Sequence, residues 1–160
     1  MVQKQDSEIK ITHLKCREIQ APIVSSLIQG FVREIGYEKA IEIAKKVISE
    51  DAMRSGEKLA REYSGNTIVE LARIVREVWA KDNAMEITII KETKNELFFD
   101  VTYCGYAELY EQMGIKEIGF ILSCNRDFPF VEGFNPEIQL NRRKTIMEGA
   151  KYCDFRYIKR

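Results

Sequence analysis

Three cysteines in the second half of the chain have the side-chain chemistry that nucleophilic or acid–base catalysis would use: Cys104, Cys124 and Cys153. Cys104 is predicted to lie where a strand ends and a helix begins, and the free backbone N–H groups of a helix start favour a thiolate. Glu108 follows one helical turn later on the same face, so it could serve as an acid or base beside that thiol. Cys104 and Glu108 are therefore the first candidates for catalysis.

A second cluster of candidates lies between residues 116 and 127. Glu117 and Cys124 are seven residues apart and share a face if the segment 116–124 is helical. Asp127 follows in a predicted turn, where a carboxylate either bonds to local backbone in an Asx-turn or takes part in catalysis. The sequence leaves these two roles of Asp127 open.

Cys153 is predicted to lie in a strand, with Phe155 on its own face and with Asp154 and Arg156 on the opposite face. Cys153 has apolar neighbours, as does Cys16, and a free cysteine is often buried as a small hydrophobic residue. We therefore expect Cys153 to be a pocket wall or core residue rather than the reacting thiol.

The sequence contains no local metal or cofactor motif. The cysteines form no CxxC pair, and the single histidine, His13, is far from them in sequence, so a zinc signature is missing. A mixed Cys, Asp and Glu site assembled by the fold stays open, and a Cys–His dyad would require His13 to fold back onto the cysteines. We otherwise expect His13 to be a polar residue on an N-terminal arm. Neither GxGxxG nor GxxxxGK[ST] occurs, so we predict no nucleotide cofactor.

Composition narrows the class of protein. With 160 residues, 45% of them hydrophobic and 31% charged, the chain is expected to fold as one globular domain over residues 1–160. The formal net charge is zero, which argues against nucleic-acid and membrane binding, and the basic run 142–144 indicates a solvated strand edge. Residues 1–7 do not have the pattern of a secretory signal, so we expect a cytoplasmic location with reduced thiols.

Apolar residues recur at helical spacing over the first half, which is expected to be mainly helical up to residue 83. Ile23, Leu27 and Phe31 mark one helix, and the segment 41–48 marks another, with Gly36 as the stop between them.

Two more helices are predicted before the first strand. One covers residues 50–63, and the next begins at an Asn66 cap and carries an apolar stripe that ends at Trp79, a predicted core residue.

The apolar period changes to two from residue 85. Residues 85–103 predict a β-hairpin with a turn at 94–96, and the segments 137–146 and 152–158 predict a second antiparallel pair. Short helices are expected after the first hairpin and over 116–124. The sequence therefore predicts an α+β fold in which N-terminal helices pack on an antiparallel sheet made of two hairpins, with short helices between them.

An ordered series of motifs runs from the first hairpin to the last strand: Val101–Glu108, Gly114, Glu117–Gly119, Cys124–Asp127, Phe134–Pro136, Thr145–Gly149 and Cys153–Arg156. This series resembles the L-2-amino-thiazoline-4-carboxylic acid hydrolase family, closely over the last third of the chain and in layout over the helical first half. The resemblance implies a hydrolase that opens a cyclic amidine C–N bond of a small amino-acid-like substrate, converting a thiazoline toward a carbamoyl-cysteine.

The resemblance also implies which residues form the site: Cys104, Glu108, Glu117, Cys124, Asp127, Asn135, Cys153 and Asp154. Opening the ring needs a nucleophile, a base, and an acid for the leaving nitrogen. Either Cys104 or Cys124 attacks while Asp127 or Glu108 moves protons, or a carboxylate activates water and the thiols only line the pocket. A cation for the substrate carboxylate would come from Arg126 or Arg156.

A different class of function uses the same cysteines without turnover, in a module that binds a small molecule or a metal or senses redox state. Convergence of the candidate cysteines and Asp127 on a closed polar pocket would favour the enzyme, and a tetrahedral arrangement would favour a metal site. An exposed edge strand also leaves a homo-oligomer open.

Overall fold

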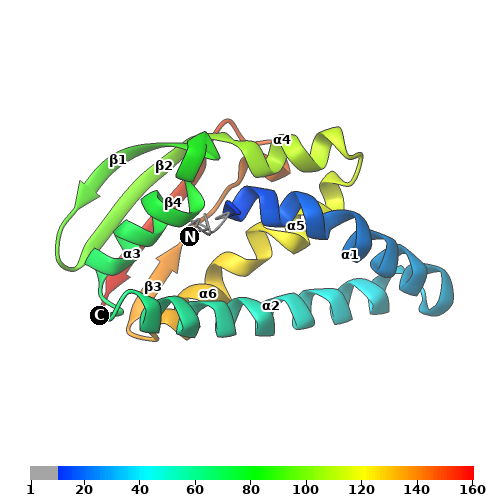
Figure 1. Ribbon diagram of the computed structural model, residues 1–160, viewed down its shortest axis with the longest axis horizontal. Coiled ribbons are helices and arrows are strands. Elements are labelled where there is room, and N and C mark those ends of the chain that lie inside the picture. Colours follow the sequence, from blue (N-terminus) through cyan, green and yellow to red (C-terminus); the bar gives the residue numbers. More distant parts are fainter. Residues whose placement is uncertain (1–10) are drawn as a thin grey trace, which may run out of the picture.

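The computed structural model describes residues 11–160, in which two long antiparallel helices extend away from a four-stranded sheet (Figure 1). The first helix, α1 (His13–Ile35), is capped by the Thr12 side chain, and the second is α2 (Tyr37–Glu62). Gly36 joins them at φ 84°, in a region of backbone conformation that glycine enters without a steric penalty. The predicted stop at Gly36 is confirmed.

Two expectations about these helices need correction. The segments 41–48 and 50–63 belong to one continuous helix, because no residue between them interrupts the backbone hydrogen bonds of α2. The apolar stripe of Ile23, Leu27 and Phe31 that marks α1 also faces outward, since all three side chains are exposed, Ile23 by 68%. The buried side of α1 instead carries Ala21, Ser25 and Ile28, whose two small residues let neighbouring elements approach closely.

Short helical segments connect the long helices to the sheet and the strands to one another. Thr67 caps the first of them in a capping box with Glu70, so the predicted cap at Asn66 is one residue too early. In chain order the segments are α3 (Ile68–Ile74), the π-helical turn η1 (Val75–Trp79), η2 (Lys81–Asn83), α4 (Gly105–Gln112), α5 (Lys116–Leu122), η3 (Cys124–Arg126), α6 (Asp127–Phe134) and η4 (Ile146–Glu148).

The sheet is antiparallel throughout, in the order β1-β2-β4-β3. Its strands are β1 (Met85–Glu92), β2 (Glu96–Cys104), β3 (Ile138–Asn141) and β4 (Cys153–Lys159). The fold is therefore α+β, with N-terminal helices, two antiparallel pairs and short helices between them, as predicted. The strand predicted over 137–146 ends early because the chain leaves the sheet after Asn141.

Side chains of β4 alternate between the core and the outer face of the sheet, as the period of two predicts. Cys153, Phe155 and Tyr157 are buried, whereas Asp154 and Arg156 lie half-exposed on the other face. The inner face packs with α3 and α6 into the main hydrophobic core. Across residues 11–160, no helix combines the length and the apolar character needed to cross a bilayer.

The two helices α2 and α6 touch through backbone at two glycines. A Cβ at Gly56 would overlap the carbonyl oxygen of Phe130, and a Cβ at Gly133 would overlap that of Met53. Only glycine permits this approach on both helices. The contact fixes α6, and with it Asp127 at its first position, against the second half of α2.

Candidate functional site

A cavity of about 410 Å³, partly open to solvent, lies between the start of α1, the second half of α2 and the inner face of the sheet. Its walls come from nearly every part of the chain between α1 and β4, so it exists only in the complete fold. The polar and sulfur-bearing residues that line it are His13, Cys16, Arg17, Gln20, Asp51, Ser55, Lys58, Glu62, Met85, Cys104, Tyr106, Ser123, Cys124, Arg126, Asp127, Arg142, Thr145, Met147 and Cys153.

All four cysteines line this one cavity as free thiols. Burial raises the pKa of Cys104 and of Cys124, and it raises the pKa of Cys153 to about 11. Cys104 does precede the first residue of α4, but burial outweighs the opposing influence of the amides of Tyr106 and Ala107. Cys104, Cys124 and Cys153 are therefore protonated at neutral pH, contrary to the thiolate expected at Cys104.

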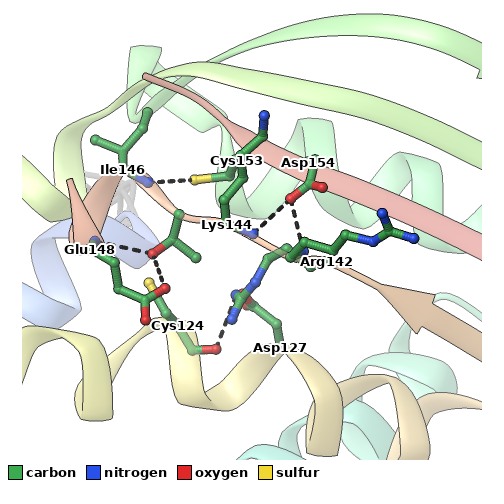
Figure 2. A network of polar contacts seen from close by, with 10 residues as sticks. Cys124, Asp127, Arg142, Lys144, Ile146, Glu148, Cys153 and Asp154 are labelled. Atoms are coloured by element: carbon green, nitrogen blue, oxygen red, sulfur yellow. Dashed lines mark hydrogen bonds and ion pairs between the residues drawn. The ribbon is translucent and has the colours of Figure 1, made fainter. Parts of the chain in front are cut away.

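Asp127 faces the cavity and forms an ion pair with Arg142, whose guanidinium also donates to the carbonyl of Cys124 (Figure 2). The side chains of Arg142 and Asp127 are 5% and 20% exposed. Burial raises the pKa of Asp127 to about 6, although Arg142 and Arg126 act in the opposite direction. A carboxyl group with this pKa exchanges a proton close to neutral pH, as a general acid or base must.

Arg126, which η3 places beside Asp127, is buried against α2. It contacts the Asp51 carboxylate at 2.7 Å and donates to the Ser55 hydroxyl at 3.2 Å. Both partners belong to α2, so this arginine joins the helix to the segment that carries Cys124 and Asp127.

His13 lies in the first turn of α1 and lines the cavity, so the expectation of a polar residue on an N-terminal arm is wrong. Its Nδ1 is 2.9 Å from the Tyr106 hydroxyl, and its Nε2 is 3.3 Å from an Arg17 nitrogen. Burial, Arg17 and Arg126 lower the pKa of His13 to about 3. The imidazole is therefore neutral at physiological pH.

The structure does not bring every candidate residue to the cavity. Glu108 is at the surface and accepts hydrogen bonds from Tyr103 and Gln112, because its helix turns this face outward. Glu117 borders a separate hollow between α1, α2 and α5. Neither carboxylate lines the cavity that holds the cysteines.

Three other candidates hold the backbone or the outer face of the sheet. Asn135 ends α6 and bonds to the carbonyl of Asn66, and Asp154 accepts from the amides of residues 143 and 144 (Figure 2). Arg156 pairs with Asp100 across the outer face at 2.7 Å. Of the two arginines considered for the substrate carboxylate, only Arg126 lines the cavity.

Sequence reasoning missed Arg17, Tyr106 and Arg142 as cavity residues. His13 and Arg17 are four residues apart, which places them on one face of a helix, and this spacing was an available signal. Arg142 gave no such signal, because its inward direction depends on where the chain leaves β3. The basic run 142–144 is therefore not simply a solvated edge.

No three His, Cys, Asp or Glu side chains within residues 11–160 come together in a way that could hold a metal ion.

The fold is similar to that of two solved structures. The phenol-responsive sensory domain of the transcription activator PoxR, solved with phenol, is 12% identical with a TM-score of 0.54, over 87% of this chain and 73% of that one. A trafficking protein particle complex subunit 3 from Naegleria fowleri, covalently bound to palmitic acid, is 13% identical with a TM-score of 0.53, over 91% of this chain and 95% of that one. At this identity the likeness concerns the fold alone.

The sequence itself assigns the family. Residues 16–157 match the L-2-amino-thiazoline-4-carboxylic acid hydrolase family, and the chain belongs to that family. A comparison with curated proteins finds no match. The resemblance seen in the ordered motifs of the second half is confirmed, and it extends to the helical first half.

Proposed function

We propose that this protein is a hydrolase that opens the cyclic amidine of a small amino-acid-like substrate such as 2-aminothiazoline-4-carboxylate. The observation that carries the proposal is Asp127, a largely buried carboxylate on the cavity wall with a pKa near 6 and a fixed orientation against Arg142. Membership of the hydrolase family supports the reaction class. The cavity volume of about 410 Å³ is ample for a five-membered ring with its substituents.

The proton transfers can all be assigned to Asp127. Its carboxylate takes a proton from water while the water oxygen bonds to the carbon of the protonated amidine and the C=N electron pair moves to nitrogen, which gives a neutral tetrahedral carbon bearing a hydroxyl group. The tetrahedral carbon then expels a ring atom, which takes the proton from Asp127, and the hydroxyl group passes its proton to the regenerated carboxylate as it becomes the carbonyl. C–N opening releases the ring nitrogen as an amine, whereas C–S opening releases a thiol.

The protonated state of the thiols favours water over cysteine as the nucleophile. Cys104 and Cys124 would each have to lose a proton against the cost of burial before attacking the amidine carbon. In this proposal the cysteines shape the pocket, and Asp127 supplies the catalysis.

The decisive experiment measures turnover of 2-aminothiazoline-4-carboxylate by mass spectrometry, with NMR to identify the bond that opens. We expect Asp127→Asn to lower kcat by about 100-fold or more, because the amide cannot accept the proton. Cys104→Ala and Cys124→Ala should each keep kcat within about 10-fold. Activity of the wild type should rise with pH through about 6 as Asp127 ionises.

Asp100→Asn is the matched control, since Asp100 also pairs with an arginine but on the outer face of the sheet. It should leave kcat unchanged. Loss of activity in Cys104→Ala or Cys124→Ala equal to that in Asp127→Asn would instead support a thiol nucleophile.

A second candidate function is a ligand-binding module without turnover. The two similar folds hold phenol and palmitic acid in their own structures, and the cavity of this chain has an apolar side formed by Trp79, Phe130 and Phe155. Saturable binding of the thiazoline by the wild type, with no product after prolonged incubation, would favour this module.

A further inference from the structure

The positively charged side chains that line the cavity differ in whether they form an ion pair with a carboxylate. Among residues 11–160, Arg17 of α1 forms no ion pair, and its buried Nε has no hydrogen-bond partner. The other three cations each contact a carboxylate: Lys58 with Glu62, Arg126 with Asp51, and Arg142 with Asp127.

A chain of hydrogen bonds holds the Arg17 guanidinium in place. Tyr106 donates its hydroxyl proton to the carbonyl of Trp79 at 3.0 Å, so the same oxygen must accept from Nδ1 of His13. Because His13 is neutral, its Nε2 carries no proton and accepts from Nη2 of Arg17 at 3.3 Å. Gln20 accepts from Nη1 at 2.9 Å.

These contacts leave Nε–H of Arg17 unsatisfied while both terminal nitrogens are held. Nε and Nη2 lie on the same edge of a guanidinium, and that edge matches the two oxygens of a carboxylate. A buried N–H without an acceptor costs free energy that an incoming anion would recover.

Charge around Arg17 also favours an anion. Burial lowers the pKa of both Arg17 and His13, and the nearby positive charge of Arg126 lowers both further, although Asp51 acts on Arg17 in the opposite direction. A bound carboxylate would relieve that repulsion, and the neutral His13 adds no competing charge.

We propose that Arg17, positioned by His13 and supported by Arg126, forms an anion-binding subsite that receives the carboxylate of a small cyclic ligand. The identity of the ring rests on the proposed function, whereas the subsite itself rests on the contacts of Arg17. The subsite would hold the substrate by the group that does not react and would select against rings that lack a carboxylate.

Binding can be tested apart from turnover with thiazolidine-4-carboxylate, which lacks the C=N bond and cannot be opened as an amidine. Calorimetry of the full chain should give tighter binding of this compound than of thiazolidine. We expect Arg17→Gln to weaken binding of the carboxylate by about 10-fold to 100-fold, the range for a charged hydrogen-bonded contact, and to leave binding of thiazolidine unchanged. Arg17→Lys should recover part of the affinity.

Arg33→Gln is the matched control, because Arg33 lies on the same helix with an exposed side chain outside this cavity. It should bind like the wild type. Equal affinity of Arg17→Gln and wild type for the carboxylate would overturn the subsite, as would failure of the wild type to bind the carboxylate more tightly than thiazolidine.

The two proposals fail separately. If 2-aminothiazoline-4-carboxylate is not hydrolysed but Arg17→Gln still binds thiazolidine-4-carboxylate more weakly than the wild type, the subsite stands and the hydrolase proposal falls. If inorganic sulfate binds to the wild type as tightly as the carboxylate and weakens equally in Arg17→Gln, the site is a general anion site and the assignment to a ring-borne carboxylate is overturned.

Discussion

An arginine–aspartate pair lies against each face of the sheet, and the two pairs have different environments. On the inner face Arg142 contacts Asp127 and lies over the ring of Phe155, with the arginine side chain 5% exposed. On the outer face Arg156 contacts Asp100 and lies over the ring of Phe98, with the arginine side chain 27% exposed. The same two residue types thus meet an aromatic ring in both places.

Burial decides what each pair can do. The two carboxylates have similar exposures, 20% for Asp127 and 23% for Asp100, so the pairs differ in the arginine and in the protein around them. Burial in the cavity wall moves the pKa of Asp127 toward neutral pH, and the charge of Asp127 depends on Arg142. The outer pair is partly solvated, and such pairs add little to stability. Residue type and pairing alone therefore do not identify a reactive carboxylate.

The largest expected difference between the two faces is the cost of removing the arginine. Arg142→Met should lower the free energy of unfolding by about 3–5 kcal/mol at pH 8, because Asp127 would keep a buried charge without its partner. At pH 5 the cost should be smaller, since Asp127 can then bind a proton. Urea unfolding at the two pH values measures both quantities, and equal losses at pH 5 and pH 8 would contradict this account of the pair.

A smaller effect on the free energy of unfolding should come from His13, which lines the cavity on the inner side of the sheet and is held neutral. Its lowered pKa means that the unfolded chain binds a proton below pH 6.5 while the folded chain does not until about pH 3. The contribution of His13 to the free energy of unfolding is therefore fully present above pH 6.5 and is lost as the pH falls toward 3. Between pH 7 and pH 4, the wild type should lose about 3 kcal/mol more than His13→Gln.

Asp127 acts in the opposite direction over part of this range, because its raised pKa makes the folded chain hold a proton more tightly below about pH 6. This contribution is common to wild type and His13→Gln, so it cancels in their difference. Identical pH profiles for the two proteins in urea unfolding would show that His13 is not held neutral.

The smallest effect is expected on the outer face. Arg156→Met should lower the free energy of unfolding by at most about 1 kcal/mol, because the pair that it breaks is partly solvated. Turnover of the thiazoline should be unchanged, since Arg156 does not line the cavity. A loss as large as that of Arg142→Met would remove the distinction between the two faces.

The sequence predicted the inner and outer sides of β4 correctly, because a strand alternates its side chains regardless of what surrounds it. It also placed both antiparallel pairs and most of the helices, but it divided α2 into two helices and expected a turn at Asp127, where α6 begins. The ordered motifs led to the family and included Asp127, although its role was left open between a turn and catalysis.

Other features of the site depend on contacts between distant segments. The run 142–144 contains one inward arginine, Arg142, only because the strand ends at Asn141, and no periodicity marks that point. His13 reaches the cavity because α1 places its first turn near Tyr106, which is 93 residues away in sequence. The raised pKa of Cys104 likewise follows from burial, which opposes the local effect of a helix start.

The glycine contact between α2 and α6 has a mechanical consequence for the cavity. Where side chains separate two helices, rotamer changes can absorb a small tilt, but backbone atoms in direct contact have no such freedom. Gly56 and Gly133 therefore act as a rigid joint that keeps Asp51 on one helix and Asp127 on the other at a constant separation. Ligand binding should then leave the spacing of α2 and α6 unchanged, so that any adjustment of the cavity comes from α1, which carries Arg17.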